Sequence, residues 1–313
     1  MNKKIVVLGG GNGQSVLLKG LKKFPLDITA IVTVADNGKS TGRLREEFHT
    51  PAVGDIRRVL ISLSETEPLV EKLFNYSFET NTDLNGHKVG NLILTAAKEI
   101  TGNLSDGIEA LSKVFNLKGK VVPLTEDDVT LMAEMEDGSL VEGEEEITFS
   151  NKKIKRVFYK EEPIITPDAI KSIKEADVIV LSMGSIYTSI IPNLINKEII
   201  NAIDSSKAKI IYTANMMTQP GETDGFKISD HIKLLNSYLG KRKVEIVIAN
   251  NKEIDKDILD KYQTKEQKDA VIVDYDNLKD ITLVEDDFFI IENGMVRHDS
   301  LKLAFHIFIE TFK

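Results

Sequence analysis

The sequence predicts an α/β protein with a doubly wound, mainly parallel sheet and a small β-rich insertion. Short apolar, β-branched runs alternate with helical patterns along most of the chain, and such continuous runs are typical of strands buried on both faces. Residues from about 120 to 162 break this alternation, so we place the insertion there. A chain of 313 residues can bury a large core, and we expect one domain over 1–313.

The chain begins with an expected strand, glycine turn and helix. An apolar run at 5–8 leads into GGGNG at 9–13, and an amphipathic stretch follows at 15–21. Glycines let backbone N–H groups approach a ligand, and the first turn of a helix leaves N–H groups unpaired at its positive end. We therefore interpret this turn as a cradle for a nucleotide phosphate, made by Gly10, Gly11, Asn12 and Gly13. Its spacing departs from the dinucleotide fingerprint, and a tight turn without a ligand is the alternative.

Five later apolar runs are expected to be strands of the same sheet: 28–34, 177–181, 208–213, 244–249 and 270–273. Helical patterns are present at 89–100 and 168–176, and a final amphipathic helix is expected over 301–312. Thr166 is expected to cap the second of these helices, with Pro167 at its first position.

The expected insertion contains a hairpin signal. Residues 130–146 alternate in polarity around Asp137-Gly138, a pair that favours a tight turn between two strands. We therefore expect antiparallel strands in this part of the chain, in contrast to the parallel sheet elsewhere.

The expected strands end in polar or glycine-rich segments. In an open parallel sheet, ligands bind outside the carboxyl ends of the strands, where the strand order reverses. After the glycine turn, such segments follow at 36–43, 182–185, 215–223 and 250–251. Each alone is ordinary loop chemistry, but together they favour a shared site, whose ligand-binding residues we expect to include Ser185, Asn215, Thr218 and Gln219.

The loop at 36–43 combines an acid with donors and glycines. Asp36 lies where such folds place an acid on a ribose hydroxyl or a metal, and we expect ligand contacts from Asp36 and Asn37. The alternative is a helix start capped by Ser40 or Thr41. Asp55, in GDIRR at 54–58, either caps a helix or holds a divalent cation.

Composition excludes several classes of function. The 49 acidic and 40 basic residues are scattered along the chain and give a net charge of −9, so we expect no nucleic-acid partner. No apolar run reaches the roughly 18 residues that span a bilayer, and the first residues do not form a signal-peptide pattern, so we expect a cytoplasmic protein. The absence of cysteine excludes thiolate chemistry. The histidines show no metal-ligand spacing, and no residue stands out as a nucleophile.

Seven motifs in series carry a resemblance to a known family. They are GGGNG at 9–13, DNGKSTGRLR at 36–45, GDIR at 54–57, GHKVGNL at 86–92, GSIYTSIIPNL at 184–194, MTQPGET at 217–223 and VRHD at 296–299. With these motifs the chain resembles the gluconeogenesis factor family, within the superfamily of 2-phospho-L-lactate transferase (CofD-like) proteins. The resemblance covers nearly the whole chain and implies a Rossmann-like core.

The resemblance also implies a function. Such a protein binds a uridine diphosphate sugar, typically UDP-N-acetylglucosamine, supports gluconeogenic growth and links carbon supply to cell-wall precursor synthesis and cell shape. It implies ligand contacts from Tyr262 and Arg297, and glucosamine-6-phosphate synthase as a partner. Arginine suits bidentate contact with a diphosphate, and a tyrosine ring suits stacking. The alternatives are a packing ring for Tyr262 and a surface ion pair for Arg297.

The chain departs from the family pattern at positions that bear on catalysis. Asn37 and Lys39 replace an aspartate and a glycine of the family loop, and Arg58 stands where asparagine is common. We therefore expect a regulatory binding protein that requires no cofactor. The alternative is a Mg²⁺-dependent transferase of nucleotidyl or phosphoryl groups, with Asp36 or Asp55 on the metal. The sequence does not fix the oligomeric state, and a homo-oligomer is compatible with it.

The carboxy-terminal helix suggests a route to regulation. We expect it to begin beside Arg297, with Asp299 or Ser300 as its cap. A phosphate on Ser300 would add negative charge next to Arg297 and compete with the ligand for it. The alternative is that Ser300 is a helix cap that is never modified.

Overall fold

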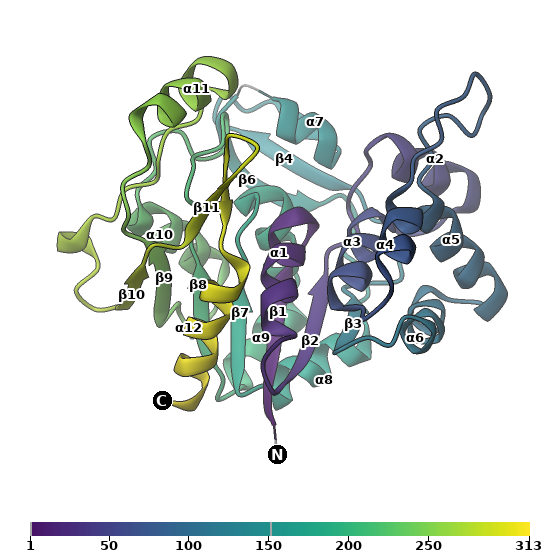
Figure 1. The fold of residues 1–313 in the computed structure, drawn as a ribbon, viewed down its shortest axis with the longest axis horizontal. Helices are drawn as coiled ribbons and strands as arrows, with labels where there is room; N and C mark the ends of the chain where they lie inside the picture. Colours follow the sequence, from purple (N-terminus) through teal and green to yellow (C-terminus); the bar gives the residue numbers. More distant parts are fainter. Residues whose placement is uncertain (1, 151) are drawn as a thin grey trace.

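A computed structural model describes residues 2–150 and 152–313, and its largest feature is a seven-stranded sheet (Figure 1). The strand order is β10-β9-β8-β7-β1-β2-β3, and every neighbouring pair is parallel. The bounds are β1 Lys3–Gly9, β2 Leu26–Val32, β3 Lys120–Pro123, β7 Val178–Leu181, β8 Lys209–Thr213, β9 Ile246–Asn250 and β10 Thr282–Asp286. This order matches the 3-2-1-4-5-6 order of the Rossmann fold, extended by one strand. The predicted doubly wound α/β fold is confirmed.

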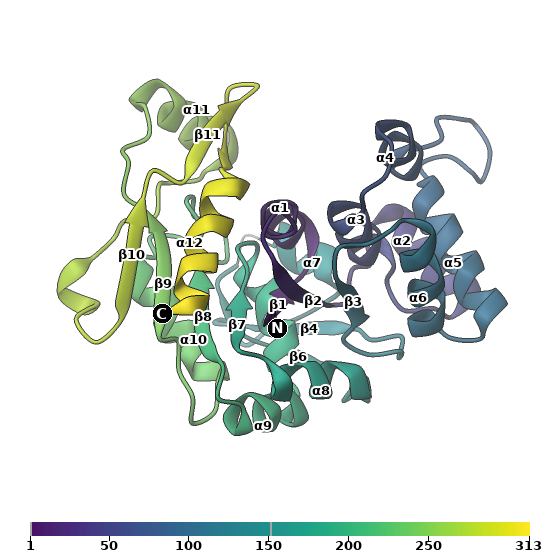
Figure 2. The ribbon, with the colours of Figure 1, turned by 60° about the horizontal axis from the view of Figure 1, so that its bottom comes forward.

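Helices cover both faces of the sheet. Figure 2 shows α12, α1 and α3 over one face and α8, α9 and α10 over the other. The bounds on the first face are α1 Gly11–Leu21, α3 Gly54–Leu63 and α12 Ser300–Phe312, and those on the second are α8 Pro167–Glu175, α9 Lys197–Ser205 and α10 Ile228–Tyr238. All four residues of β7 are buried, as its uninterrupted apolar sequence predicts.

The remaining helices lie at the sides of this core. They are α2 Lys39–Phe48, α4 Pro68–Asn75, α5 Val89–Thr101, α6 Leu104–Val114, α7 Glu144–Phe149 and α11 Lys256–Glu266. Ser40 and Thr41 lie inside the first turn of α2, whose cap is Gly38, so neither caps it. Within the described residues, no helix is both long and apolar enough to cross a membrane.

Two small antiparallel sheets accompany the main one. The first has the order β5-β4-β6, formed by β4 Leu131–Met135, β5 Leu140–Glu142 and β6 Ile154–Tyr159, and it contains the predicted hairpin. The second pairs β11 Phe289–Glu292 with β12 Met295–His298. The expected insertion starts later than residue 120, because β3 pairs with β2 in the central sheet.

Two predictions about local structure are wrong. Residues 270–273 are not a strand: only Ala270 forms an isolated bridge, with Met217. The seventh strand is β10, whose partly exposed edge position does not require a continuous apolar run. Thr166 does precede α8, and Pro167 is its first residue, but the Thr166 hydroxyl donates to the Pro123 carbonyl at 2.8 Å and does not cap the helix.

Candidate ligand-binding site

The candidate site lies where the strand order reverses, between β1 and β7. Residue Leu8 of β1 pairs with Leu181 of β7, so the segments that follow these strands emerge side by side. A Cβ on Gly13 would lie 1.9 Å from the carbonyl oxygen of Met183, which leaves no room for a side chain. The glycine turn and the loop after β7 therefore pack directly against each other, at the position where such sheets bind ligands.

A cavity of about 280 Å³ opens at this position. Its walls come from the start of α1, the loops after β7 and β8, α11 and β12. Eight of the residues predicted to bind a ligand line this cavity: Asn12, Gly13, Ser185, Asn215, Thr218, Gln219, Tyr262 and Arg297. The structure therefore brings together segments that lie far apart in the sequence.

The loops around the cavity are fixed by side chains that bond to backbone. The amide of Asn215 accepts from the N–H of Gly184 at 2.9 Å and donates to its carbonyl at 2.7 Å. The hydroxyl of Thr218 accepts from the N–H of Asp269 at 2.8 Å. The polar atoms of these two side chains thus have partners within the protein. The two side chains therefore hold the wall of the cavity in place.

A buried carboxylate lies behind the wall formed by Ser185 and Gln219. Glu222 accepts a hydrogen bond from the Ser185 hydroxyl and another from the Gln219 amide, each at 2.6 Å. Burial raises the pKa of Glu222 to about 7. The motif at 217–223 marked this loop, but nothing in the sequence distinguished Glu222 within it.

Tyr262 connects α11 to the strand that carries Arg297. Its ring is buried beside Met216, Ile254 and Val296, and its hydroxyl accepts from the N–H of Val296 at 2.9 Å. The residue is thus a packing ring whose edge reaches the cavity, and it fixes the backbone next to Arg297. Figure 1 shows α11 beside the β11–β12 hairpin.

Arg297 is the cation of the cavity that is available to a ligand. It is exposed on β12, and in the described part of the chain no carboxylate lies within ion-pair distance of its guanidinium. Lys268, which also lines the cavity, pairs with Glu266 at 2.7 Å. Burial lowers the pKa of His298 to about 4, so this ring is neutral near pH 7.

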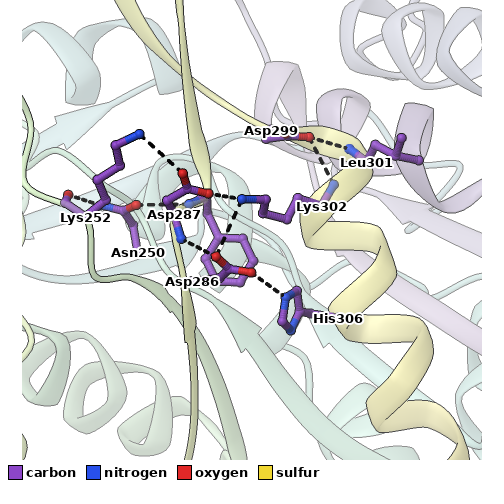
Figure 3. Close-up of polar contacts among 9 residues, drawn as sticks. Asn250, Lys252, Asp286, Asp287, Asp299, Leu301, Lys302 and His306 are labelled. Atoms are coloured by element: carbon purple, nitrogen blue, oxygen red, sulfur yellow. Dashed lines mark hydrogen bonds and ion pairs between the residues drawn. The ribbon is translucent and has the colours of Figure 1, made fainter.

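A network of charged residues fixes the helix that follows Arg297 (Figure 3). Asp299 caps α12 by accepting from the N–H groups of Leu301 and Lys302, at 3.1 and 3.0 Å. Lys302 in turn pairs with Asp286 and Asp287, and the ring of His306 lies 3.0 Å from Asp286. The end of β10 is thereby tied to α12, the helix that begins two residues after β12.

The other predicted residues, Gly10, Gly11, Asp36 and Asn37, do not line this cavity. Asp36 accepts from the N–H of Gly38 at 2.8 Å, and Asn37 binds α7 through the N–H of Glu145 at 2.9 Å. Neither residue lines the cavity. Gly10 and Gly11 also lie outside the cavity lining, although they belong to the same turn.

Asp55 is buried and bonds to the start of α1. It pairs with Arg58 and accepts from the N–H of Gly11, whose φ of +61° suits glycine. One donor at this helix start therefore already has a carboxylate partner. Asp55 lies in the first turn of its own helix, α3, and not at the capping position.

The acids near the glycine turn disfavour each other's charge. Burial raises the pKa of Asp55 to about 6, with a smaller contribution from Asp36, while Arg58 opposes the rise. Burial, followed by the charges of Asp36 and Asp55, raises the pKa of Glu144 to about 7. Within residues 2–150 and 152–313, no group of three or more His, Cys, Asp or Glu side chains is arranged to hold a metal ion. Arg58 already pairs with Asp55, and the N–H of Gly38 donates to Asp36.

Comparison with known proteins shows which proteins are related to this chain. The family model of 2-phospho-L-lactate transferase CofD matches residues 5–289. The gluconeogenesis factor of Bacillus subtilis (strain 168) is 46% identical over 304 residues, covering 96% of both chains. That of Halalkalibacterium halodurans is 44% identical over 311 residues, covering 96% of this chain and 94% of the relative.

A solved structure agrees with the sequence comparison. The crystal structure of a protein from Bacillus halodurans has a TM-score of 0.95 and 44% identity to this chain, and covers 98% of this chain and 100% of its own. Identity at this level over whole chains shows common descent, and the fold and the motifs agree with it. The chain therefore belongs to the gluconeogenesis factor family of CofD-like proteins.

Proposed function

We propose that this protein is a regulatory factor that binds a nucleotide sugar, UDP-N-acetylglucosamine, in the cavity between α1 and β12. The observation that carries the proposal is the position of Arg297, a cation without a carboxylate partner in the described residues, on the same cavity as the start of α1. A guanidinium and the N-terminus of a helix both favour a phosphate group.

The size of the surrounding cavities supports a ligand longer than a single phosphate group. A cavity of about 430 Å³ shares Asn215 and Met216 with the central one. Another of about 490 Å³ shares Asn12, Val16, Arg297 and His298 with it. A diphosphate at Arg297 would leave room on either side for the nucleoside and for the sugar.

The family supports a regulatory role. The relatives are named for gluconeogenesis, and we propose that the bound sugar nucleotide reports cell-wall precursor supply in the cytoplasm and thereby affects cell shape. The proposed protein partner is glucosamine-6-phosphate synthase. Co-elution of the two proteins in gel filtration, with and without the sugar nucleotide, tests this partner.

The alternative function is a Mg²⁺-dependent transferase with Asp36 or Asp55 on the metal. The pairing of Asp55 with Arg58 disfavours this alternative, because a guanidinium beside the carboxylate opposes the binding of a divalent cation. Incubation of UDP-N-acetylglucosamine with the protein and Mg²⁺ separates the two functions. An intact sugar nucleotide supports a binding protein, whereas release of UDP or UMP supports an enzyme.

A further inference from the structure

Glu222 stands behind the ligand cavity, and the proposed function gives it no role. Its side chain is 5% exposed and does not line the cavity, but both residues that donate to it, Ser185 and Gln219, do. It also accepts from the backbone N–H of Tyr187. Glu222 therefore determines where the hydrogens of two cavity residues point.

An ionised Glu222 withholds the Ser185 hydrogen from a ligand. A carboxylate only accepts hydrogen bonds, so the single hydroxyl hydrogen of Ser185 is directed to it. The Ser185 oxygen accepts in turn from the N–H and the hydroxyl of Thr188, both at 2.9 Å. When Glu222 is protonated, it becomes a donor itself, and the Ser185 hydrogen is free to turn toward the cavity.

We propose that Glu222 is a positioning residue that couples proton uptake to anion binding. Its protonation frees the Ser185 hydroxyl to donate to a phosphate oxygen, and it removes a negative charge from behind the cavity. This inference rests on the proposed function, because it takes the phosphates of the nucleotide sugar as the anion.

The groups around Glu222 support this assignment between pH 6 and 8. Tyr187, which packs against it, has a pKa raised by burial to a value far above this range. Arg297, Lys268 and Glu266 line the cavity, and His298 has a pKa lowered to about 4 by burial. Glu222 and Glu144 have pKa values raised to about 7, and that of Asp55 is raised to about 6. Of these acids, Glu222 is the one whose carboxylate bonds directly to side chains that line the cavity, Ser185 and Gln219.

Calorimetric titration of the full chain with UDP-N-acetylglucosamine between pH 6 and 8 tests the coupling. We expect the dissociation constant to rise with pH through the pKa of Glu222, by at most tenfold per unit, which is the limit for linkage to one proton. Titrations in buffers of different ionisation enthalpy should show proton uptake on binding. Glu222→Gln mimics the protonated acid in shape, so this variant should bind tightly at pH 8 and lose most of the pH dependence.

Two further variants make the test specific. Glu144→Gln is the comparison variant, because burial also raises the pKa of Glu144 to about 7 and Thr188 bonds to it as well as to Ser185. If the coupling acts through Glu222, this variant should keep the pH dependence. Ser185→Ala should weaken binding more at pH 6 than at pH 8. If Glu222→Gln retained the pH dependence of the natural chain, the coupling would be overturned while the binding site stood. Absence of binding at every pH would overturn the proposed function and the coupling together.

Discussion

The side-chain amide of Asn215 bonds to both polar groups of the Gly184 backbone, at 2.9 Å to its N–H and 2.7 Å to its carbonyl. These two bonds join the loops after β7 and β8 at the edge of the ligand cavity. Asn215 therefore fixes the loop that carries Ser185.

The first prediction concerns this pair. Asn215→Ala leaves two backbone groups without partners, which should lower the free energy of unfolding by about 1–3 kcal/mol and weaken ligand binding. Urea denaturation and calorimetry measure the two effects. Asn251→Ala, at an exposed position after β9, is the control and should change stability by less than about 0.5 kcal/mol. Equal stabilities for the two variants would contradict the role given to Asn215.

A second prediction separates the ring of Tyr262 from its hydroxyl. Tyr262→Phe removes the acceptor of the Val296 N–H but keeps the packing, so binding should weaken about three- to tenfold through the displaced neighbour Arg297. Tyr262→Ala also removes the ring, and it should weaken binding tenfold or more and destabilise the fold by roughly 3 kcal/mol. Calorimetry and thermal unfolding distinguish the variants. A Phe variant that binds as weakly as the Ala variant would assign the whole effect to the hydroxyl.

A third prediction follows from the buried acids. The pKa values of Asp55, Glu144 and Glu222 are raised to about 6, 7 and 7. Ordinary carboxyls ionise near pH 4, so between about pH 4.5 and 7 the folded protein holds protons that the unfolded chain has lost. The free energy of unfolding should therefore fall as the pH rises through this window, by up to about 3 kcal/mol for each Glu.

Chemical denaturation at several pH values measures this slope. Glu222→Gln and Glu144→Gln should each flatten it, because each removes one of the titrating groups. A stability that rises between pH 5 and 7 would show that the folded protein does not hold the extra protons.

A fourth prediction concerns Ser300, the first residue of α12. It lines the same cavity as Arg297, Arg58 and Lys19, so added negative charge there should compete with a ligand for the guanidinium. Ser300→Glu should weaken binding by roughly threefold at low ionic strength, and salt should reduce the difference. Ser300→Gln is the uncharged control. If the Glu and Gln variants bound equally at low salt, the competition would have no support.

The central strands could be predicted from sequence because they are buried on both faces. Residues 178–181, for example, are apolar throughout and form β7. β10 could not be found in this way, because an edge strand is partly exposed and its sequence, TLVED, is half polar. α2 was expected only as the alternative for residues 36–43, because its sequence, KSTGRLREEF, is almost entirely polar and is equally typical of a loop.

The site was predictable in so far as it follows from topology. Polar segments after parallel strands meet at one edge, and eight of the predicted residues line one cavity there. No pattern in the sequence separates Asp36 and Asn37 from that cavity, since their positions depend on contacts with the start of α2 and with α7. The buried position of Glu222 could not be predicted either, because its partner Ser185 lies 37 residues away along the chain.

The proposed ligand site is tested most directly by calorimetric titration of the natural chain and Arg297→Ala with UDP-N-acetylglucosamine. We predict saturable binding to the natural chain and a dissociation constant at least tenfold higher for the variant, because a charged hydrogen bond contributes about 1.5–3 kcal/mol. Arg156→Ala, on β6 and paired with Glu134, is the control and should bind normally. Equal affinity of Arg297→Ala and the natural chain, or binding of NAD in place of the sugar nucleotide, would contradict the account.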